Sequence, residues 1–292
     1  MFSIIIPTFN NLKYLKLCLK SIRKNSKFDH EIIPHVNVGD DGTLEYLNEE
    51  KINYSYTKHN SGICEGVNKA ARLSTTNYIL YAHDDFYFCP RWDEIMYEEL
   101  KKFKNNLFYL SGYMIEKKSV NNQFGENIEN FKEDVLLKNF DKIKIDDFQG
   151  STWAPHLIHK DIWNKIGGLS EEYYPGTGSD PDLNKKLWDI GVRIFKGLGQ
   201  SKVYHFGSIV TRRVNRTPNI LTESGSKGGK IFLLKWGMSI KFFKKYYLES
   251  NNYYVAPLRE PNKSLNFLFN LLLCKVYYFY IKTISLFKKK SS

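Results

Sequence analysis

The chain has few cysteines, and they do not form a metal-binding motif. Its 292 residues contain Cys18, Cys64, Cys89 and Cys274, and no two of them have the close spacing of a zinc site. Internal repeats, low-complexity linkers and an N-terminal signal peptide are also missing, the last because Ser3 already begins a β-rich run. We therefore expect reduced thiols and a cytoplasmic protein.

Acidic residues are scarce in the last third of the sequence. Residues 201–292 contain 17 Lys and Arg residues but only three Glu residues, giving a net charge of +14, whereas the first 200 residues carry −2. Aromatic side chains interleave with the lysines, as in residues 241–247. Nucleic acid is not the expected partner because no recognition motif accompanies this composition. An anionic membrane surface is favoured, on the cytoplasmic face of a membrane.

One apolar stretch, Leu265–Phe287, is long enough to span a bilayer. Asn266, Asn270, Lys275 and Lys282 would each add to the free energy of insertion, so an interfacial helix is favoured over a spanning one. The alternative is a helix that packs on the rest of the protein or on a second subunit. The composition changes near residues 217–229.

Strands alternate with helices in the first 90 residues. Each β-rich run is followed by a loop and then by apolar residues at helical spacing. This alternation predicts parallel βαβ units in a doubly wound α/β sheet. The runs are Ser3–Ile6, Glu31–Val38, Ile52–Thr57 and Tyr78–Ala82, and helices are expected near residues 12–22, 44–47 and 63–73.

The last of these strands runs into His83-Asp84-Asp85-Phe86. Ligands of an open α/β sheet bind beyond the carboxyl ends of its strands. Adjacent carboxylates repel one another unless a proton or cation compensates them, so this pair suggests a divalent metal with oxygen ligands. The alternative is a turn or a helix cap.

A set of short motifs occurs in order along the first 210 residues, roughly. The motifs are Ser3–Asn10, Asp40–Thr43, Asn60–Gly62 with Asn68, Ala82–Asp85, Gly167–Leu169, Ser179–Leu183 and Val203–Gly207. Together they resemble family 2 glycosyltransferases with the GT-A nucleotide-sugar fold, which is Rossmann-like, with a mostly parallel central sheet flanked by helices. With the composition change near residues 217–229, this predicts a catalytic domain over residues 1–216, followed by a basic, aromatic-rich helical extension over 217–292.

The resemblance implies an inverting enzyme that moves a sugar from a nucleotide diphosphate to a hydroxyl of a glycan, a lipid-linked or a protein-linked acceptor. Such a reaction passes through an oxocarbenium-like transition state. It needs a cation that compensates the charge of the departing diphosphate, a base that deprotonates the acceptor hydroxyl, and a site that binds and orients the nucleotide.

For the metal, the resemblance assigns Asp85 and His205 as ligands, with Asp84 nearer the ribose or sugar hydroxyls. Histidine is a softer donor than oxygen, so Mn²⁺ is expected and Mg²⁺ is the alternative. His83 stands where many relatives carry an acid. It could be a ligand, but packing beneath the diphosphate is favoured.

For the base, the resemblance assigns Asp180. The family places two acids here, and this chain has Ser179 in place of the first. Any tuning of the Asp180 pKa must then come from burial or from the donor. The alternative for Asp180 is a helix cap, and Asp182 is expected to be a structural contact.

For the nucleotide, Asp41 is the family's partner of the pyrimidine edge, and Pro7 and Phe9 lie where the base is sandwiched. A carboxylate accepts from a ring imide N–H, which favours uracil or thymine, so a UDP-sugar is expected.

For the acceptor side, Trp153 is predicted as a wall for the acceptor or the donor sugar. Arg212, Arg213 and Arg216 are predicted as a clamp over the diphosphate, with solvated surface charge as the alternative.

Two other functions remain open. A sugar-phosphate nucleotidyltransferase is disfavoured because no Gly-rich, basic triphosphate loop lies near Pro7. A catalytically impaired module that binds sugar or membrane is suggested by His83 and Ser179, which replace acids.

Overall fold

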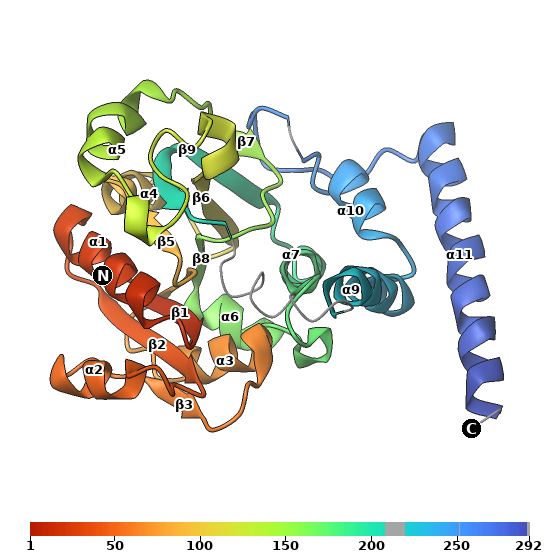
Figure 1. The fold of residues 1–292 in the computed structure, drawn as a ribbon. Coiled ribbons are helices and arrows are strands. Elements are labelled where there is room, and N and C mark those ends of the chain that lie inside the picture. The colour runs from red at the N-terminus through yellow and green to blue at the C-terminus, as the bar shows by residue number, and fades with distance from the viewer. Residues whose placement is uncertain (208–219, 251, 291–292) are drawn as a thin grey trace.

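The structure is a computed structural model that describes residues 1–207, 220–250 and 252–290, without the side chains of 220–226 and 284–290. A nine-stranded sheet forms its centre, in the order β3-β2-β1-β4-β8-β6-β9-β5, with β7 paired to β9. Helices cover the sheet, and three further helices follow the last strand toward the C-terminus (Figure 1). The predicted α/β class is confirmed.

The first half of the sheet is parallel, as predicted. Its strands β3, β2, β1 and β4 are joined by crossover helices, and β1 pairs in parallel with both β2 and β4. Ile4, Ile5 and Ile6 are fully buried, as expected for a strand covered on both faces. The elements are β1 (Ser3–Phe9), α1 (Leu12–Asn25), β2 (Glu31–Asn37), α2 (Thr43–Glu49), β3 (Ser55–Thr57), α3 (Gly62–Ala71) and β4 (Tyr78–Tyr81).

The second half of the sheet is mixed. β8 (His156–His159) runs antiparallel between β4 and β6 (Phe108–Glu116). β9 (Ile194–His205) is parallel to β6, and β5 (Phe86–Phe88) and β7 (Phe148–Gln149) are antiparallel to β9. The doubly wound pattern is therefore limited to the first half. The helices of this half are α4 (Trp92–Leu100), α5 (Glu133–Asn139), α6 (Lys160–Ile166) and α7 (Ser179–Asp189).

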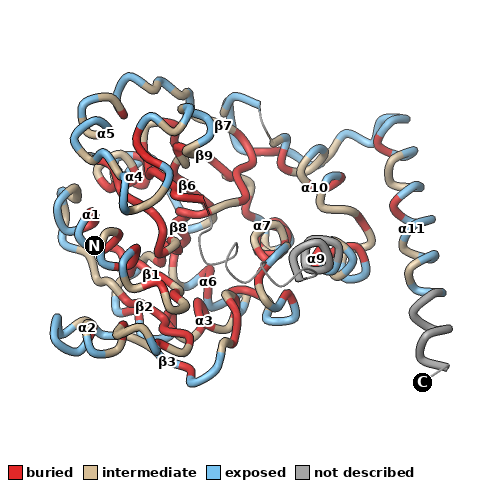
Figure 2. The backbone as a smooth tube through the Cα atoms, in the orientation of Figure 1, coloured by how far each residue is buried: buried red, intermediate tan, exposed pale blue. Residues whose placement is uncertain are grey.

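The predicted C-terminal extension is helical, and part of it shares the main core. α9 (Ile220–Trp236) and α10 (Ile240–Tyr246) contribute buried side chains such as Phe232 and Phe243 to that core. The expected boundary at residue 216 lies outside the described residues. α11 (Leu265–Lys290) lies along the outside and is largely exposed (Figures 1 and 2). No helix in the described ranges is long and apolar enough to cross a membrane.

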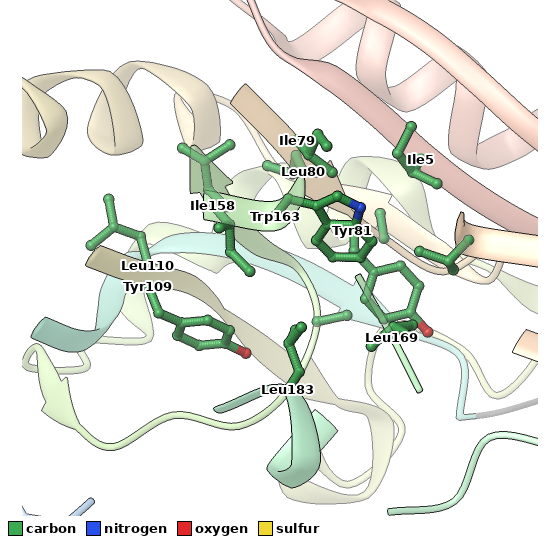
Figure 3. Packing of buried hydrophobic residues seen from close by; sticks show 14 of the residues in the cluster. Ile5, Ile79, Leu80, Tyr81, Tyr109, Leu110, Ile158, Trp163, Leu169 and Leu183 are labelled. Carbon is green, nitrogen blue, oxygen red and sulfur yellow. The ribbon is translucent and has the colours of Figure 1, made fainter. Parts of the chain in front are cut away.

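The core contains two buried tyrosines on central strands of the sheet. Figure 3 shows Tyr109 of β6 extending toward Leu183 of α7, and Tyr81 of β4 toward Leu169. Both rings are almost completely buried. Tyr109 therefore faces α7, whereas Tyr81 faces the segment between α6 and α7.

Candidate active site

The carboxylates that follow β4 are buried at the edge where the parallel strands end. Asp84 is 6% exposed and Asp85 is 3% exposed. The hydroxyl of Thr8, near the end of β1, donates a hydrogen bond to Asp84 Oδ2 at 2.7 Å. The adjacent strands β1 and β4 therefore deliver Thr8 and Asp84 to one place, as the topology of a parallel sheet requires.

His205 reaches the same place through the antiparallel pairing of β5 with β9. Phe86 is the register partner of His205, and the Phe206 amide donates to the Asp85 carbonyl oxygen at 3.2 Å. His205 Nε2 lies 3.4 Å from Asp85 Oδ2. Together with His83, these two residues offer three ligand atoms within 4.8 Å of one another.

Charged neighbours set the protonation of His205. Burial alone would lower the pKa of His205, but hydrogen bonds to Asp85 and Glu116 outweigh burial and raise the pKa to about 9. Glu116 Oε1 lies 2.7 Å from His205 Nδ1. Glu116 could not be predicted from the sequence, because only the register of β6 with β9 brings it opposite His205.

His83 has a different environment. Burial lowers the pKa of His83 to about 4, so its imidazole is neutral near pH 7. Its Nε2 lies 3.0 Å from the Tyr81 hydroxyl, and its ring stacks on Phe86 at 4.8 Å between centroids. His83 therefore packs on Phe86 and also lies beside Asp85 and His205, while its packing beneath a diphosphate remains a prediction.

This donor set fits a divalent transition metal. Two imidazoles and a carboxylate match the preferences of Mn²⁺ better than those of Mg²⁺, which prefers oxygen. The residues predicted as ligands, Asp85 and His205, are brought together. Their assignment as ligands remains a prediction, and so does the metal.

Asp180 is the second residue of α7 and does not cap it. The helix begins after Gly178, which has a φ of +93° and no side-chain cap, so the cap interpretation of Asp180 fails. The residue is half-buried, but Oδ1 is inaccessible to water and has no hydrogen-bond partner among the described residues. Burial raises the pKa of Asp180 to about 7. A carboxyl group in this state can exchange a proton near neutral pH.

Several other buried polar atoms that lack partners among the described residues lie near Tyr109. The Tyr109 ring lies 4.9 Å from that of His156, and its hydroxyl donates to the Trp153 carbonyl oxygen at 3.3 Å. The pKa of Tyr109 is raised well above 10, first by burial and then by the charge of Asp180. Within the described part of the chain, the buried atoms that lack partners include both ring nitrogens of His156, Trp153 Nε1, Ser111 Oγ, Ser151 Oγ and Asn184 Oδ1.

Such a cluster is unusual, because most buried polar atoms in proteins are hydrogen-bonded. It lies on β6, β8, α7 and the loop before β8, next to Asp180. The loop before β8 contains Trp153, which was predicted from the sequence as a wall for a sugar. The Trp153 ring stacks on that of Phe148 with 5.6 Å between the ring centroids. The sequence offered no signal for His156 or Asn184 as site residues. Buried polar atoms of this kind are commonly satisfied by ordered water.

Asp182 is a structural contact, as expected. It is fully buried and accepts hydrogen bonds from Ser170 Oγ at 2.6 Å, Tyr173 Oη at 3.2 Å and Trp236 Nε1 at 2.8 Å. The Lys235 ammonium group lies 3.0 Å away. Through its contacts with Trp236 and Lys235, Asp182 links α7 to α9 and so helps to fix the position of Asp180.

The predicted nucleotide residues lie at the same edge of the sheet. Pro7 and Phe9 are half-buried near the end of β1. Asp41 accepts hydrogen bonds from the Leu12 amide at 2.7 Å and from Thr43 Oγ1 at 2.6 Å, so it also holds the starts of α1 and α2. A role of Asp41 with the nucleotide base remains a prediction. Arg212, Arg213 and Arg216 lie outside the described residues.

Comparisons with known proteins agree with this geometry. A family model described as Glycosyl transferase family 2 matches residues 3–162. Among solved structures, that of S. aureus TarS 1-349 in complex with UDP-GlcNAc has a TM-score of 0.55 at 14% identity, over 80% of this chain and 66% of that chain. A second TarS 1-349 structure has a TM-score of 0.53 at 16% identity, over 70% and 60%.

A longer TarS structure has a TM-score of 0.54 at 15% identity, over 80% of this chain and 42% of that chain. The chain thus spans less than two thirds of the length of these TarS structures. No curated protein matches the chain. At these identities the solved structures show the fold, which is GT-A, and the family model covers more than half of the sequence. The chain therefore belongs to glycosyl transferase family 2.

Proposed function

We propose that this protein is a metal-dependent, inverting glycosyltransferase that uses a UDP-sugar and a hydroxyl acceptor on a glycan, a lipid-linked or a protein-linked molecule. One observation carries the proposal. Two histidines and Asp85 converge beyond β4, while Asp180, with its pKa near 7, lies close enough to Tyr81 and Tyr109 for its charge to raise the pKa of both. A cation site and a base are the two groups that this transfer needs.

The donor is held at the carboxyl ends of β1 and β4. Asp85, His205 and His83 would hold the divalent ion, which compensates the charge of the departing diphosphate. Asp84, oriented by Thr8, is assigned to the ribose or sugar hydroxyls. Pro7, Phe9 and Asp41 are assigned to the uracil base. UDP-GlcNAc is the first donor to test, because TarS was solved with it and shares the fold.

The acceptor hydroxyl is deprotonated by Asp180 in this proposal. The oxygen then attacks the anomeric carbon from the face opposite the diphosphate, and a single displacement inverts the configuration. Burial keeps part of the Asp180 population protonated at pH 7, but the carboxylate that remains is a stronger base than an exposed aspartate. Trp153 and the polar atoms around Tyr109 are assigned to sugar hydroxyls and sugar faces.

The experiment is a screen of the purified protein against nucleotide sugars, with and without Mn²⁺. It records thermal shift and release of nucleoside diphosphate, and Asp85→Ala is run beside the wild type. We expect one UDP-sugar to stabilise the wild type and to be hydrolysed only with metal. Asp85→Ala should lose at least about 100-fold in turnover, as when one electrostatic contact to a reacting group is removed.

The alternative of a catalytically impaired binding module makes a different prediction. A donor that stabilises the protein without any turnover, under all metals and acceptors, would support the module. No response to any donor, with Asp85→Ala indistinguishable from the wild type, would reject the proposal.

A further inference from the structure

The outer face of α11 is a long exposed apolar surface. Its side chains are between 49% and 86% exposed, from Leu268 and Tyr277 at the lower limit to Leu265 at the upper. Soluble proteins seldom leave a continuous apolar surface of this length uncovered. The face comprises Leu265, Leu268, Phe269, Leu272, Leu273, Val276, Tyr277, Phe279 and Tyr280.

The inner face of the same helix is already occupied. Phe267 packs on Phe242 of α10 at 5.0 Å between ring centroids, and the Ser239 amide donates to Cys274 Sγ at 3.4 Å. Leu271, Tyr278 and Ile281 continue this stripe at helical spacing and pack against the core. α11 is therefore attached to α9 and α10 by one stripe (Figures 1 and 2), and its opposite face points away from the described part of the protein.

The charged side chains of the segment that contains this helix have a single sign. Residues 261–292 contain six lysines and no acidic residue. Lys275 and Lys282 lie on the flank between the inner stripe and the outer face, and both are exposed. A second copy of α11 would bring lysines without any carboxylate in the segment to pair with them. Anionic lipid headgroups supply that negative charge.

We propose that α11 binds the surface of an anionic lipid bilayer, lying in the plane of the interface. Its outer face enters the boundary between headgroups and acyl chains, and its lysines contact the headgroups. Tyr277 and Tyr280 suit this depth, because each combines an apolar ring with a polar hydroxyl. The surface would hold the rest of the enzyme beside the membrane.

The experiment is vesicle flotation of the full chain. We use phosphatidylcholine vesicles with and without phosphatidylglycerol, at low and high salt. The wild type should float with the anionic vesicles and less so at high salt. The triple variant Phe269→Gln/Val276→Gln/Tyr280→Gln should lose at least about tenfold in binding, since each change removes buried apolar area. Its melting temperature should be unchanged, because these side chains are exposed.

The matched control is Tyr56→Gln/Leu73→Gln/Val135→Gln, which removes three exposed apolar side chains far from α11. It should bind vesicles like the wild type. The proposal is overturned if the wild type binds neither kind of vesicle, or if the control variant loses as much binding as the α11 variant. If the wild type does not bind lipid but forms a dimer, and the α11 variant is a monomer, the outer face would be assigned to contact with a second copy instead. Neither donor nor metal is present, so failure here leaves the proposed function untouched.

Discussion

At the scale of single residues, the environment of Asp180 differs clearly from that of an exposed aspartate. Its Oδ1 lacks a partner among the described residues, and burial raises its pKa to about 7. Only the deprotonated form can accept a proton. The kcat/KM for transfer should therefore rise about tenfold per pH unit below pH 7 and level off above it, which a pH profile with a fixed donor measures.

Asp180→Asn keeps the shape of this side chain and removes its basicity. We expect turnover to fall by about 10² to 10⁴-fold, with donor binding retained in a thermal-shift titration. Asp161→Asn, at an exposed carboxylate on α6, is the control and should keep wild-type turnover. Retained turnover in Asp180→Asn would assign the base to another residue.

His156 offers a second test at this scale, because its ring nitrogens have no hydrogen-bond partner in the described part of the chain and lie among aromatic rings. His156→Phe replaces buried polar atoms by apolar ones, so the melting temperature should stay constant or rise. Because the proposed function assigns these nitrogens to sugar hydroxyls, we expect the KM of this variant for a sugar substrate to rise several-fold. A stabilised variant with unchanged kinetics would make His156 a core residue only.

At the scale of elements, the position of α7 depends on close packing against α9. A Cβ atom at Gly228 would lie 2.0 Å from the Thr177 carbonyl oxygen, whereas one at Gly229 would meet nothing within 4 Å. Gly228→Ala should therefore destabilise the protein by about 1–3 kcal/mol and lower turnover by moving α7. Gly229→Ala should be neutral or stabilising by up to about 1 kcal/mol, since alanine favours a helix. Chemical denaturation of both variants measures the difference.

At the scale of the whole molecule, α9 and α10 belong to the same core as the sheet. Phe232, Phe243 and Leu248 are buried in it. A protein truncated after residue 216, the boundary predicted from composition, should therefore lack a cooperative thermal transition. Truncation after residue 263 removes only α11 and should leave the transition within a few degrees of the wild type. Calorimetry distinguishes the two, and a folded 1–216 protein would show that the extension is independent.

The sequence by itself determined the parallel half of the fold. The strand that precedes Asp84 and Asp85 was predicted, since apolar runs and short loops alternate there and each local pattern agrees with its neighbours. The family motifs also pointed to His205 and Asp180. These predictions rest on patterns that are local in the chain.

The mixed half of the sheet was not predicted. β5 and β7 are three and two residues long, too short for a recognisable period. β9 contains Lys196, which looks like a surface residue in the sequence. In the structure it is buried, with its ammonium group 2.8 Å from Glu99 and 2.9 Å from Asp147. Only tertiary contacts can satisfy such a charge.

Tertiary structure alone also decided the environment of the candidate site. The sequence shows an acid at position 180, but not the burial that raises its pKa, because its neighbours include Tyr81 of β4 and Tyr109 of β6, which are distant in the chain. Glu116 meets His205 only through the register of two strands. Sequence patterns thus specified which chemical groups are present, whereas contacts between distant segments determined their protonation and their distances.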